Sequence, residues 1–328
     1  MTRGMVLGKF MPPHAGHLYL CEFAKNWVDD LTIVVGTLAA EPIPGELRHR
    51  WMRELFPADT VVHLTDENPQ DPSEHPDFWS IWQTSLERIL PERPDLVFAS
   101  EPYGAKLAEV LGAEFVPVDL PRATIPVSGT AIRTDPIRHW EFIPRCVRPH
   151  FVRRVSIIGP ESTGKTTLAR TLADTFGTVW VPEWARTVLE HRNGSLDDLN
   201  WPNLVHGQIA SEEALARNAD RVLFCDTEPL LTTVWAESLL GACPPEVTAA
   251  AAGRTYDLTL LTEPDVPWVA DQVRYLPGES EVFLDRCRTA LTRAGRTAVP
   301  LRGDWTARTE QAVGHVRALL QQTNCPVP

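Results

Sequence analysis

At 328 residues the chain is longer than one typical hydrophobic core and fits two domains of ordinary size. The net charge of −12 argues against a general nucleic-acid-binding surface, although a few loop Lys and Arg can still hold small phosphorylated ligands. No apolar run approaches the roughly 20 residues of a membrane span, and residues 1–10 lack a signal peptide's apolar core, which predicts a cytoplasmic protein without membrane partners.

Short apolar stretches alternate with longer amphipathic ones through the first half of the chain. The predicted strands are 5–7, 31–36, 60–64, 96–99 and 114–118, with helices predicted at 17–29, 46–56, 78–90 and 103–111. This β-α-β alternation predicts a parallel sheet with helices on both faces. The proline-rich stretch 66–76 cannot be regular structure and is either a functional loop or a surface excursion.

The first predicted strand runs into the sequence GKFMPPHAGH at residues 8–17. Two histidines across a glycine turn at a helix start can face one anion, where the helix dipole favours negative charge. An N–H donor from His14 or His17 would stabilise charge building on an α-phosphate. No third ligand is spaced to complete a zinc site. The stretch therefore predicts a nucleotidyl-transfer site, with Gly8 and Lys9 beside it.

A second phosphate-binding segment is predicted at VSGTAIR, residues 127–133. The hydroxyls of Ser128 and Thr130 and the guanidinium of Arg133 open another predicted helix, which suits a triphosphate and the pyrophosphate product. A hydroxyl at this point is also a common helix cap. The position at the end of the same domain favours the phosphate clamp.

The β-α-β alternation restarts in the second half of the chain, after the proline-containing stretch 143–150. We therefore expect a domain at 1–145 and another at 150–328. The predicted strands of the second are 155–158, 179–181, 221–225, 258–261 and 298–301, with a closing helix at 307–322. The predicted fold class is α/β in two domains, each a mostly parallel sheet flanked by helices.

The second domain opens on GPESTGKT at 159–166, which fits G-x-x-x-x-G-K-[ST] between a strand and a helix. Backbone N–H groups of such a loop cradle phosphates. Lys165 would meet the β- and γ-phosphates, and the Thr166 hydroxyl suits Mg²⁺. The predicted ATP-binding residues are Gly159, Glu161, Ser162, Thr163, Gly164, Lys165, Thr166 and Thr167.

Nearby carboxylates favour a kinase over a simple ATPase. Asp226 ends a predicted strand and suits Mg²⁺, while Glu183 ends another and suits accepting a proton from an attacking hydroxyl. For either one, a helix cap or a solvated carboxylate is the competing interpretation, and the sequence leaves open which of them is the base. Arg274 is a candidate lid arginine, with a surface arginine as the alternative.

The order of these motifs resembles the NadR family of nicotinamide-mononucleotide adenylyltransferases and ribosylnicotinamide kinases. The resemblance covers nearly all of the chain and also rests on FASEP (98–102), HWEFIP (139–144), PEWAR (182–186), DTE (226–228), YDLT (256–259) and WVAD (268–271). It implies a Rossmann-like nucleotidyltransferase followed by a P-loop kinase. The kinase would phosphorylate ribosylnicotinamide with Mg²⁺ and ATP, and the first domain would join the mononucleotide to AMP from a second ATP, giving NAD and pyrophosphate.

The resemblance also implies roles for individual residues. The triphosphate of the first reaction would be handled by His14, His17, Ser128, Thr130 and Arg133. Nicotinamide mononucleotide would be held by Arg50 and Trp79, the latter equally suited to the core. Ribosylnicotinamide would be bound by Glu183, Trp184, Arg186 and Glu228, although Glu228 departs from the family's Asp-Thr-Asp pattern. Some members carry an N-terminal helix-turn-helix; here the catalytic strand begins at Met5, so no DNA binding is expected.

Two other functions stay open at this stage. The same two chemistries can act on another nucleoside or nucleotide, such as a flavin, although tryptophans able to stack on a cationic pyridinium favour nicotinamide. A non-catalytic sensor of NAD or ATP is the second alternative, against which the intact His17 and Lys165 argue. A homo-oligomer is compatible with the sequence, which does not set the oligomeric state.

Overall fold

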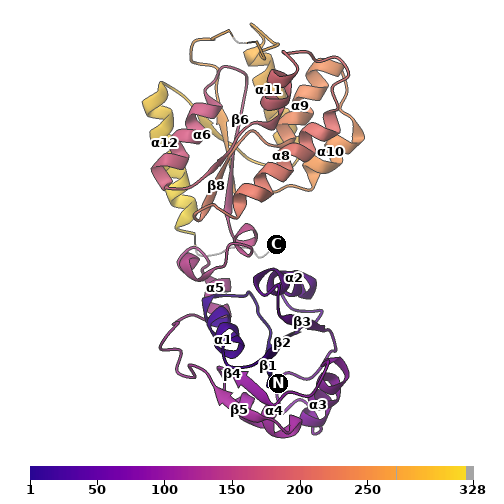
Figure 1. The fold of residues 1–328 in the computed structure, drawn as a ribbon. Helices are drawn as coiled ribbons and strands as arrows, with labels where there is room; N and C mark the ends of the chain where they lie inside the picture. The colour runs from indigo at the N-terminus through magenta and orange to yellow at the C-terminus, as the bar shows by residue number, and fades with distance from the viewer. Residues whose placement is uncertain (271, 323–328) are drawn as a thin grey trace. The chain divides into compact units, whose positions relative to one another are not determined.

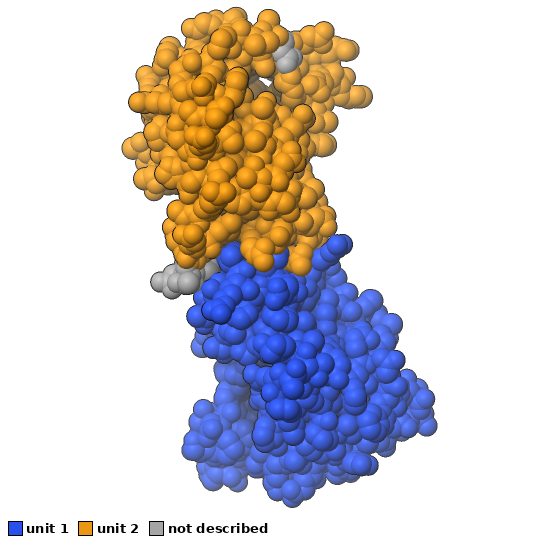
Figure 2. All heavy atoms as spheres, turned by 90° about the vertical axis from the view of Figure 1, so that its left-hand side faces the viewer, with its two compact units in different colours: residues 1–147, 323–328 blue, residues 148–322 orange. Residues whose placement is uncertain are grey.

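The structure is a computed structural model, which describes residues 1–270 and 272–322. Contacts divide these residues into two compact units, 1–147 and 148–322 (Figure 2). Each unit contains a five-stranded parallel sheet flanked by helices (Figure 1). The predicted α/β class with two parallel sheets is confirmed. Among the described residues, no helix combines the length and the apolarity that crossing a membrane demands.

The sheet of the first unit has the strand order β3-β2-β1-β4-β5. Its strands are β1 (Arg3–Gly8), β2 (Asp30–Gly36), β3 (Thr60–Leu64), β4 (Leu96–Ala99) and β5 (Glu114–Pro117). Its helices are α1 (Ala15–Lys25), α2 (Gly45–Leu55), α3 (Phe78–Ile89), α4 (Tyr103–Leu111) and α5 (Gly129–Thr134), with a 3-10 turn η1 (Trp140–Phe142). The strand order reverses between β1 and β4, and open α/β sheets bind ligands in the crevice at such a point.

Apolar side chains fill both faces of this sheet because helices cover both. Val6 and Val35 lie in one core cluster together with residues of α1 and α2. Their chain neighbours Met5 and Val34 lie in a second cluster, with residues of α3 and α4. Successive side chains of a strand point to opposite faces, so the near-continuous apolar runs of the sequence are what a covered parallel sheet requires.

The sheet of the second unit has the order β10-β9-β6-β8-β7. Its strands are β6 (Arg153–Ile158), β7 (Trp180–Val181), β8 (Val222–Asp226), β9 (Leu258–Thr262) and β10 (Val299–Leu301). Its helices are α6 (Lys165–Phe176), α7 (Trp184–His191), α8 (Trp201–Ala216), α9 (Pro229–Leu240), α10 (Pro245–Ala252), α11 (Ser280–Arg293) and α12 (Trp305–Leu320), after a 3-10 turn η2 (Arg148–His150). β6 lies between β8 and β9, which places the loop after β6 beside the ends of both neighbours.

Side-chain caps explain why two helices begin two residues before their predicted start. The helix predicted from His17 begins at Ala15, because the His14 side chain accepts a hydrogen bond from the Gly16 N–H. The helix predicted from Ala307 begins at Trp305, because the Asp304 carboxylate accepts one from the Ala307 N–H. Hydrogen bonds of this kind satisfy N–H groups that the first helical turn leaves free.

Candidate functional sites

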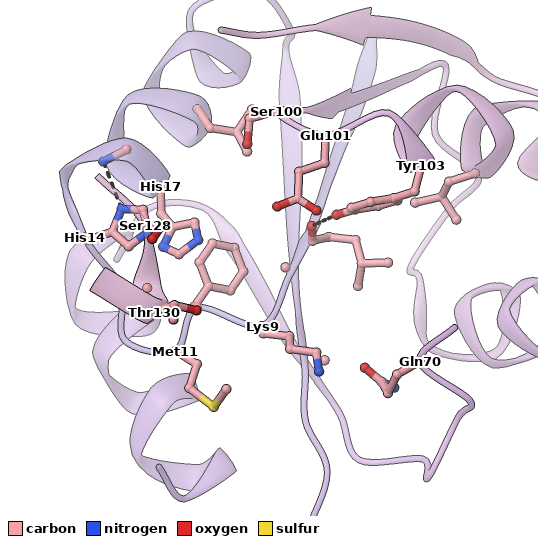
Figure 3. Close-up of a pocket in the computed structure, with 18 of the residues that line it drawn as sticks. Lys9, Met11, His14, His17, Gln70, Ser100, Glu101, Tyr103, Ser128 and Thr130 are labelled. Carbon is pink, nitrogen blue, oxygen red and sulfur yellow. Dashed lines mark hydrogen bonds between the residues drawn. The ribbon is translucent and has the colours of Figure 1, made fainter. Parts of the chain in front are cut away.

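The first unit contains a cavity of about 700 Å³ at the carboxyl end of β1. Its walls come from the loop after β1, the stretch 66–72, the start of α3, the loop after β4 and residues 127–133. Figure 3 shows His14, His17 and Ser128 gathered on one side, with Gln70 on the other. The stretch 66–76 contains no helix or strand, and four of its residues, Asp66, Gln70, Asp71 and Pro72, line the cavity. Of the two interpretations of this stretch, the geometry favours the functional loop.

The two histidines stack at the start of α1. Their ring centroids are 3.7 Å apart with an angle of 26° between the planes. His14 Nδ1 accepts a hydrogen bond from the Gly16 N–H at 3.1 Å, which leaves Nε2 as the donor of the neutral ring. Burial, with a smaller effect of Arg122, lowers the pKa of His14 to about 4. Burial and the neighbouring His14 also hold the pKa of His17 well below its usual value, so both rings are neutral N–H donors at pH 7.

Residues 127–133 dock directly on the loop after β1. The Ser128 hydroxyl caps α5 by accepting from the Ala131 N–H at 3.1 Å. Arg133 donates from Nη1 to the Met11 carbonyl at 2.5 Å and from Nη2 to the Thr130 hydroxyl at 3.2 Å. Capping and cavity lining therefore occur together at Ser128, and the structure brings this segment to the histidines.

A buried arginine of α2 supports the loop from inside the unit. Arg48 is fully buried and donates to the Lys9 carbonyl at 2.7 Å and to the Glu41 carboxylate at 2.5 Å. The Lys9 ammonium lies 3.0 Å from the same carboxylate. The structure does not bring the predicted Arg50 to this cavity. Arg50 lines a separate surface depression. It follows Arg48 by two residues on α2, and two residues of an α-helix rotate the side chain by roughly 200° about the helix axis, so the two arginines point in nearly opposite directions.

Tryptophans of α3 form part of the cavity wall. Trp79 lines the cavity and also packs against the core cluster on that face of the sheet, so the two interpretations of this residue hold together. Trp82 lines it as well and donates from its indole N–H to the Pro69 carbonyl at 2.8 Å, which fixes the stretch 66–76. Motif reasoning missed Arg122, a residue of an irregular segment whose charge acts on His14.

The second unit contains a cavity of about 170 Å³ beside the glycine-rich loop. Six of the predicted loop residues line it: Glu161, Ser162, Gly164, Lys165, Thr166 and Thr167. Thr163 does not, because its buried hydroxyl contacts the Pro160 carbonyl at 2.8 Å and the Thr262 hydroxyl at 2.6 Å. Gly159 does not line it either. Its φ is +143°, and an added Cβ would lie 2.5 Å from the Thr262 carbonyl, so it serves the close approach of loop and sheet.

A carboxylate at the end of β8 meets the helix that follows the loop. The Thr166 hydroxyl donates to Asp226 Oδ2 at 2.5 Å. The other oxygen, Oδ1, is buried and has no hydrogen-bond partner among the described residues. Burial raises the pKa of Asp226, although Lys165 and Thr166 act against it. Asp226 is 1% exposed, which excludes a solvated carboxylate. An unpaired carboxylate oxygen beside a threonine hydroxyl fits a Mg²⁺ ion and its water ligands.

Glu183 lies immediately before α7 and lines the same cavity. Its side chain makes no capping hydrogen bond to the helix, so the capping interpretation does not hold. Burial, and next the charge of Asp226, raise the pKa of Glu183 to about 7. A carboxyl group with a pKa near the working pH is well suited to accept a proton.

The segment after β9 folds back over the loop. The Ser162 hydroxyl accepts from the Val269 N–H at 2.8 Å and from Arg274 Nη1 at 3.3 Å. The Glu161 carboxylate accepts from the Tyr275 N–H at 3.0 Å. Arg274 and Tyr275 both line the cavity. These contacts favour the lid interpretation of Arg274 over an unattached surface arginine.

Glu228 is not brought to the cavity. β8 ends at Asp226, and Thr227 has a φ of +70°, so the chain turns there. The Glu228 carboxylate instead accepts two hydrogen bonds from Arg296, at 2.6 and 2.8 Å, and one from the Ser156 hydroxyl at 2.9 Å. The predicted substrate role of Glu228 is therefore corrected to a buried ion pair.

Trp184 is not brought to the cavity either. Its indole packs on Gly207 of α8, where an added Cβ would lie 2.0 Å from Nε1. Trp201 and Trp235 line the cavity in its place, and Arg186 lines it as predicted. Motif reasoning also missed Gln208, which is buried in the cavity wall. Its Oε1 accepts from the Trp184 N–H at 2.9 Å, and its Nε2 has no partner among the described residues.

Comparisons with known proteins agree with this architecture. A family model for an AAA domain matches residues 154–308. The trifunctional NAD biosynthesis/regulator protein NadR of Escherichia coli (strain K12) is 33% identical over 297 residues, covering 84% of this chain and 72% of that protein. The nicotinamide-nucleotide adenylyltransferase of Thermococcus kodakarensis is 30% identical over 162 residues, covering 47% and 84%. A crystal structure of a NadR protein in complex with NAD and AMP-PNP shares the fold, with a TM-score of 0.79 at 24% identity over 98% of this chain and 96% of that one.

Proposed function

The chain belongs to the NadR family, and we propose that it makes NAD from ribosylnicotinamide in two ATP-dependent steps. The second unit, residues 148–322, transfers the γ-phosphoryl group of ATP to the 5′-hydroxyl, giving nicotinamide mononucleotide and ADP. The first unit, residues 1–147, transfers AMP from another ATP to that mononucleotide, giving NAD and pyrophosphate. The observation that carries the proposal is one chain with two cavities, one lined by stacked neutral histidines and one by the residues of a P-loop together with Glu183.

In the adenylyl transfer, a phosphate oxygen of the mononucleotide attacks the α-phosphorus of ATP, and the bond to pyrophosphate breaks. His14 and His17 donate hydrogen bonds to the oxygens on which charge builds, a role that their neutral state supports. Ser128, Thr130 and Arg133 hold the β- and γ-phosphates and then the pyrophosphate, because they lie on the helix start that docks against the same loop.

In the phosphoryl transfer, the 5′-hydroxyl oxygen attacks the γ-phosphorus, and its proton passes to Glu183. The raised pKa of Glu183 and its position on the cavity wall support this role. Asp226 is the poorer base, since Glu183 lines the cavity and Asp226 does not. Asp226 and Thr166 would hold Mg²⁺, which when bound neutralises phosphate charge. Lys165 and the loop N–H groups hold the phosphates.

The acceptor end of the kinase cavity supports a substrate with a cationic ring and an amide. Trp201 and Trp235 line it with aromatic surface that attracts a pyridinium ring. Gln208 is held by its Oε1 and presents a buried Nε2 donor without a partner among the described residues. A carboxamide oxygen would supply the acceptor that this group lacks, and leaving such a donor unpaired is costly. Both features fit ribosylnicotinamide.

Product analysis tests the proposal. Purified protein is incubated with Mg²⁺, ATP and ribosylnicotinamide, and in parallel with riboflavin or pantetheine in place of ribosylnicotinamide. Chromatography is expected to resolve ADP, nicotinamide mononucleotide, NAD and pyrophosphate in the first reaction only. Phosphorylation or adenylylation of the other acceptors alone would assign the two chemistries to another substrate. The absence of product from every reaction would indicate a protein that binds nucleotides without catalysing either step.

A further inference from the structure

Trp305, the first residue of α12, carries an exposed aromatic ring beside the phosphate loop. The residue is 51% exposed, although a side chain of this kind usually loses most of its surface on folding. Its position is defined by the helix start, because the Asp304 carboxylate accepts from the Ala307 N–H at 2.8 Å. Nothing in the two reactions above uses this ring.

The ring rests directly on the backbone of the loop. An added Cβ at Gly164 would lie 2.1 Å from Cζ3 and 2.6 Å from Cη2 of Trp305, so only a glycine permits this approach. Gly164 also has a φ of +82° and directly precedes Lys165. The indole therefore lies next to the N–H groups that would hold the phosphates.

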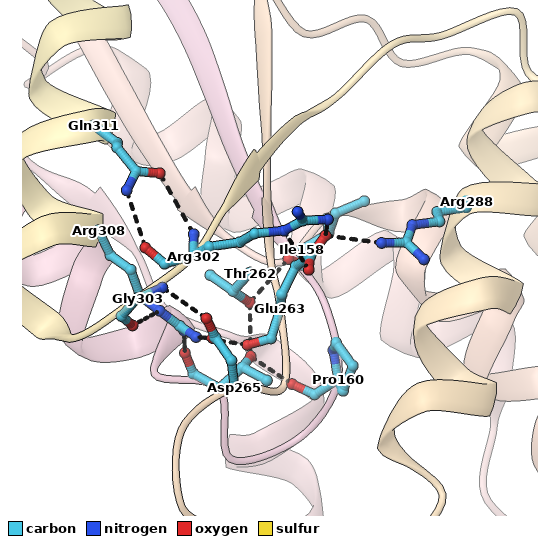
Figure 4. Close-up of polar contacts among 11 residues, drawn as sticks. Ile158, Pro160, Thr262, Glu263, Asp265, Arg288, Arg302, Gly303, Arg308 and Gln311 are labelled. Carbon is cyan, nitrogen blue, oxygen red and sulfur yellow. Dashed lines mark hydrogen bonds and ion pairs between the residues drawn. The ribbon is translucent and has the colours of Figure 1, made fainter.

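A buried arginine one turn along α12 anchors this arrangement (Figure 4). Arg308 is 2% exposed, and its guanidinium lies 5.7 Å from the Trp305 ring centroid. It donates to three backbone carbonyls, those of Gly303 (2.9 Å), Thr163 (2.8 Å) and Glu263 (2.7 Å), and pairs with the Asp265 carboxylate. The start of α12, the phosphate loop and the end of β9 are thus tied together, and the ring is held in place against the loop.

The position of the ring relative to the acceptor cavity indicates which ligand it would meet. The cavity beside the glycine-rich loop, here called the acceptor cavity, is lined by Gln208, Trp201 and Glu183 among others, and Trp305 does not line it. In a phosphoryl transfer the γ-phosphorus lies between the two nucleosides, so the base of the donor belongs outside the acceptor cavity. An exposed aromatic face beside the loop is a surface on which a purine base stacks.

We propose that Trp305 is the platform on which the base of the donor nucleoside triphosphate stacks in the kinase site. The inference rests on the proposed kinase function of the second unit and adds a binding surface for the donor's base. The alternative is that the ring only supports the loop, in which case it would affect all phosphate binding equally.

Steady-state kinetics of Trp305→Ala, with Trp305→Phe as the matched control, separate these roles. The Ala variant is expected to raise the KM for ATP in the kinase reaction about tenfold, within the range of base stacking on an aromatic ring, with kcat little changed. The Phe variant keeps most of the affinity. Inhibition by inorganic tripolyphosphate, which has no base, is expected to be unaffected. An unchanged KM for ATP, or weaker binding of tripolyphosphate to the Ala variant, would overturn the inference.

Fluorescence tests the same contact without turnover. Mg-ADP is added to wild-type protein and to Trp305→Phe, and the difference between the two emission changes reports on Trp305 alone. We expect Mg-ADP to quench the emission of the wild type more than that of the variant. Identical emission changes in the two proteins would contradict the inference. A wild-type protein that makes no nicotinamide mononucleotide would refute the proposed function, while the fluorescence difference would still decide whether a base meets this ring.

Discussion

Arg133 donates a hydrogen bond to the backbone carbonyl of Met11, a residue 122 positions earlier in the chain. This hydrogen bond links the loop that carries the two histidines to the start of α5, which carries Ser128 and Thr130. An arginine that holds a carbonyl with one nitrogen can still direct its charge toward a phosphate. In the proposed function the same side chain would therefore both assemble the adenylyl-transfer site and contribute to it.

Replacing Arg133 with methionine is expected to slow the formation of NAD from nicotinamide mononucleotide and ATP at least tenfold. The variant loses both a charge for the triphosphate and the contact to Met11, and hydrogen bonds to charged groups contribute about 1.5–3 kcal/mol. Phosphorylation of ribosylnicotinamide should continue at the wild-type rate. Arg138→Met, at an exposed position just after α5, is the control and should leave both rates unchanged.

The two reactions should be separable by single substitutions. Lys165→Ala is expected to abolish phosphorylation of ribosylnicotinamide, because the charge at the β- and γ-phosphates is lost, and to leave adenylylation of added mononucleotide intact. His17→Ala should do the reverse, so that mononucleotide accumulates from ribosylnicotinamide and ATP. Chromatography of the reaction mixtures measures both. A variant that lost the two activities together would contradict independent sites.

Glu183 should set the pH dependence of the kinase reaction. With a pKa of about 7, the carboxylate is the proton acceptor above that pH and is protonated below it, so kcat/KM is expected to rise with pH through the neutral region. Glu183→Gln should remove this rise and lower kcat roughly 10²- to 10⁴-fold. A pH profile that keeps its neutral ionisation in the Gln variant would assign the base elsewhere, with Asp226 as the next candidate.

The same ionisation should cost stability. The folded-state pKa of Glu183 lies above its unfolded value of 4.5, so the folded protein binds more protons and loses stability as pH rises from that value to about 7. Glu183→Gln removes a partly buried charge and should raise the free energy of unfolding at pH 8 by about 1–3 kcal/mol. Denaturant unfolding at pH 5 and pH 8 measures this, and the gain should be smaller at pH 5.

Gln208 should discriminate in favour of the amide-bearing acceptor. Gln208→Leu is expected to raise the KM for ribosylnicotinamide about five- to tenfold, the equivalent of one hydrogen bond of about 1 kcal/mol, without changing the KM for ATP. Gln311→Leu, at an exposed position on α12, serves as the control. Equal effects on both KM values would indicate a general disturbance of α8 rather than recognition of the acceptor.

Arg48 and Arg50 should differ sharply although they are two residues apart. Arg48→Met leaves the carboxylate of Glu41 with a weakened set of partners in the interior, and breaking a buried pair in this way costs about 3–5 kcal/mol. Arg50→Met, on the surface depression, should change stability by less than about 0.5 kcal/mol. Thermal unfolding of the two variants tests the comparison directly.

Sequence reasoning predicted the parts of the candidate sites that depend on local chemistry. The histidine loop after β1 and the glycine loop after β6 need a fixed order of residue types at a strand end, and that order is visible in the chain. The fold class followed from the same alternation of strands and helices. The two acids were found because residues at the carboxyl ends of parallel strands meet at one edge of the sheet.

What the sequence could not supply were directions and distant partners. Arg50, Trp184 and Glu228 lie one or two residues from groups that do reach a cavity wall or its loop, and only the phase of a helix or a turn decides which side chain does so. Gln208 lies far along the chain from the motif it adjoins, and its importance comes from a hydrogen bond to the Trp184 N–H. No sequence pattern predicts a hydrogen bond between a glutamine side chain and a backbone N–H 24 residues earlier in the chain.

The contrast between the neutral histidines of one cavity and the titrating glutamate of the other would give the two proposed steps different responses to acid. Adenylylation would keep its donors uncharged well below neutrality, whereas phosphorylation would already be losing its proton acceptor. In an acidified cell nicotinamide mononucleotide would therefore be consumed faster than it is formed, and the phosphorylation of ribosylnicotinamide would limit the rate of NAD synthesis.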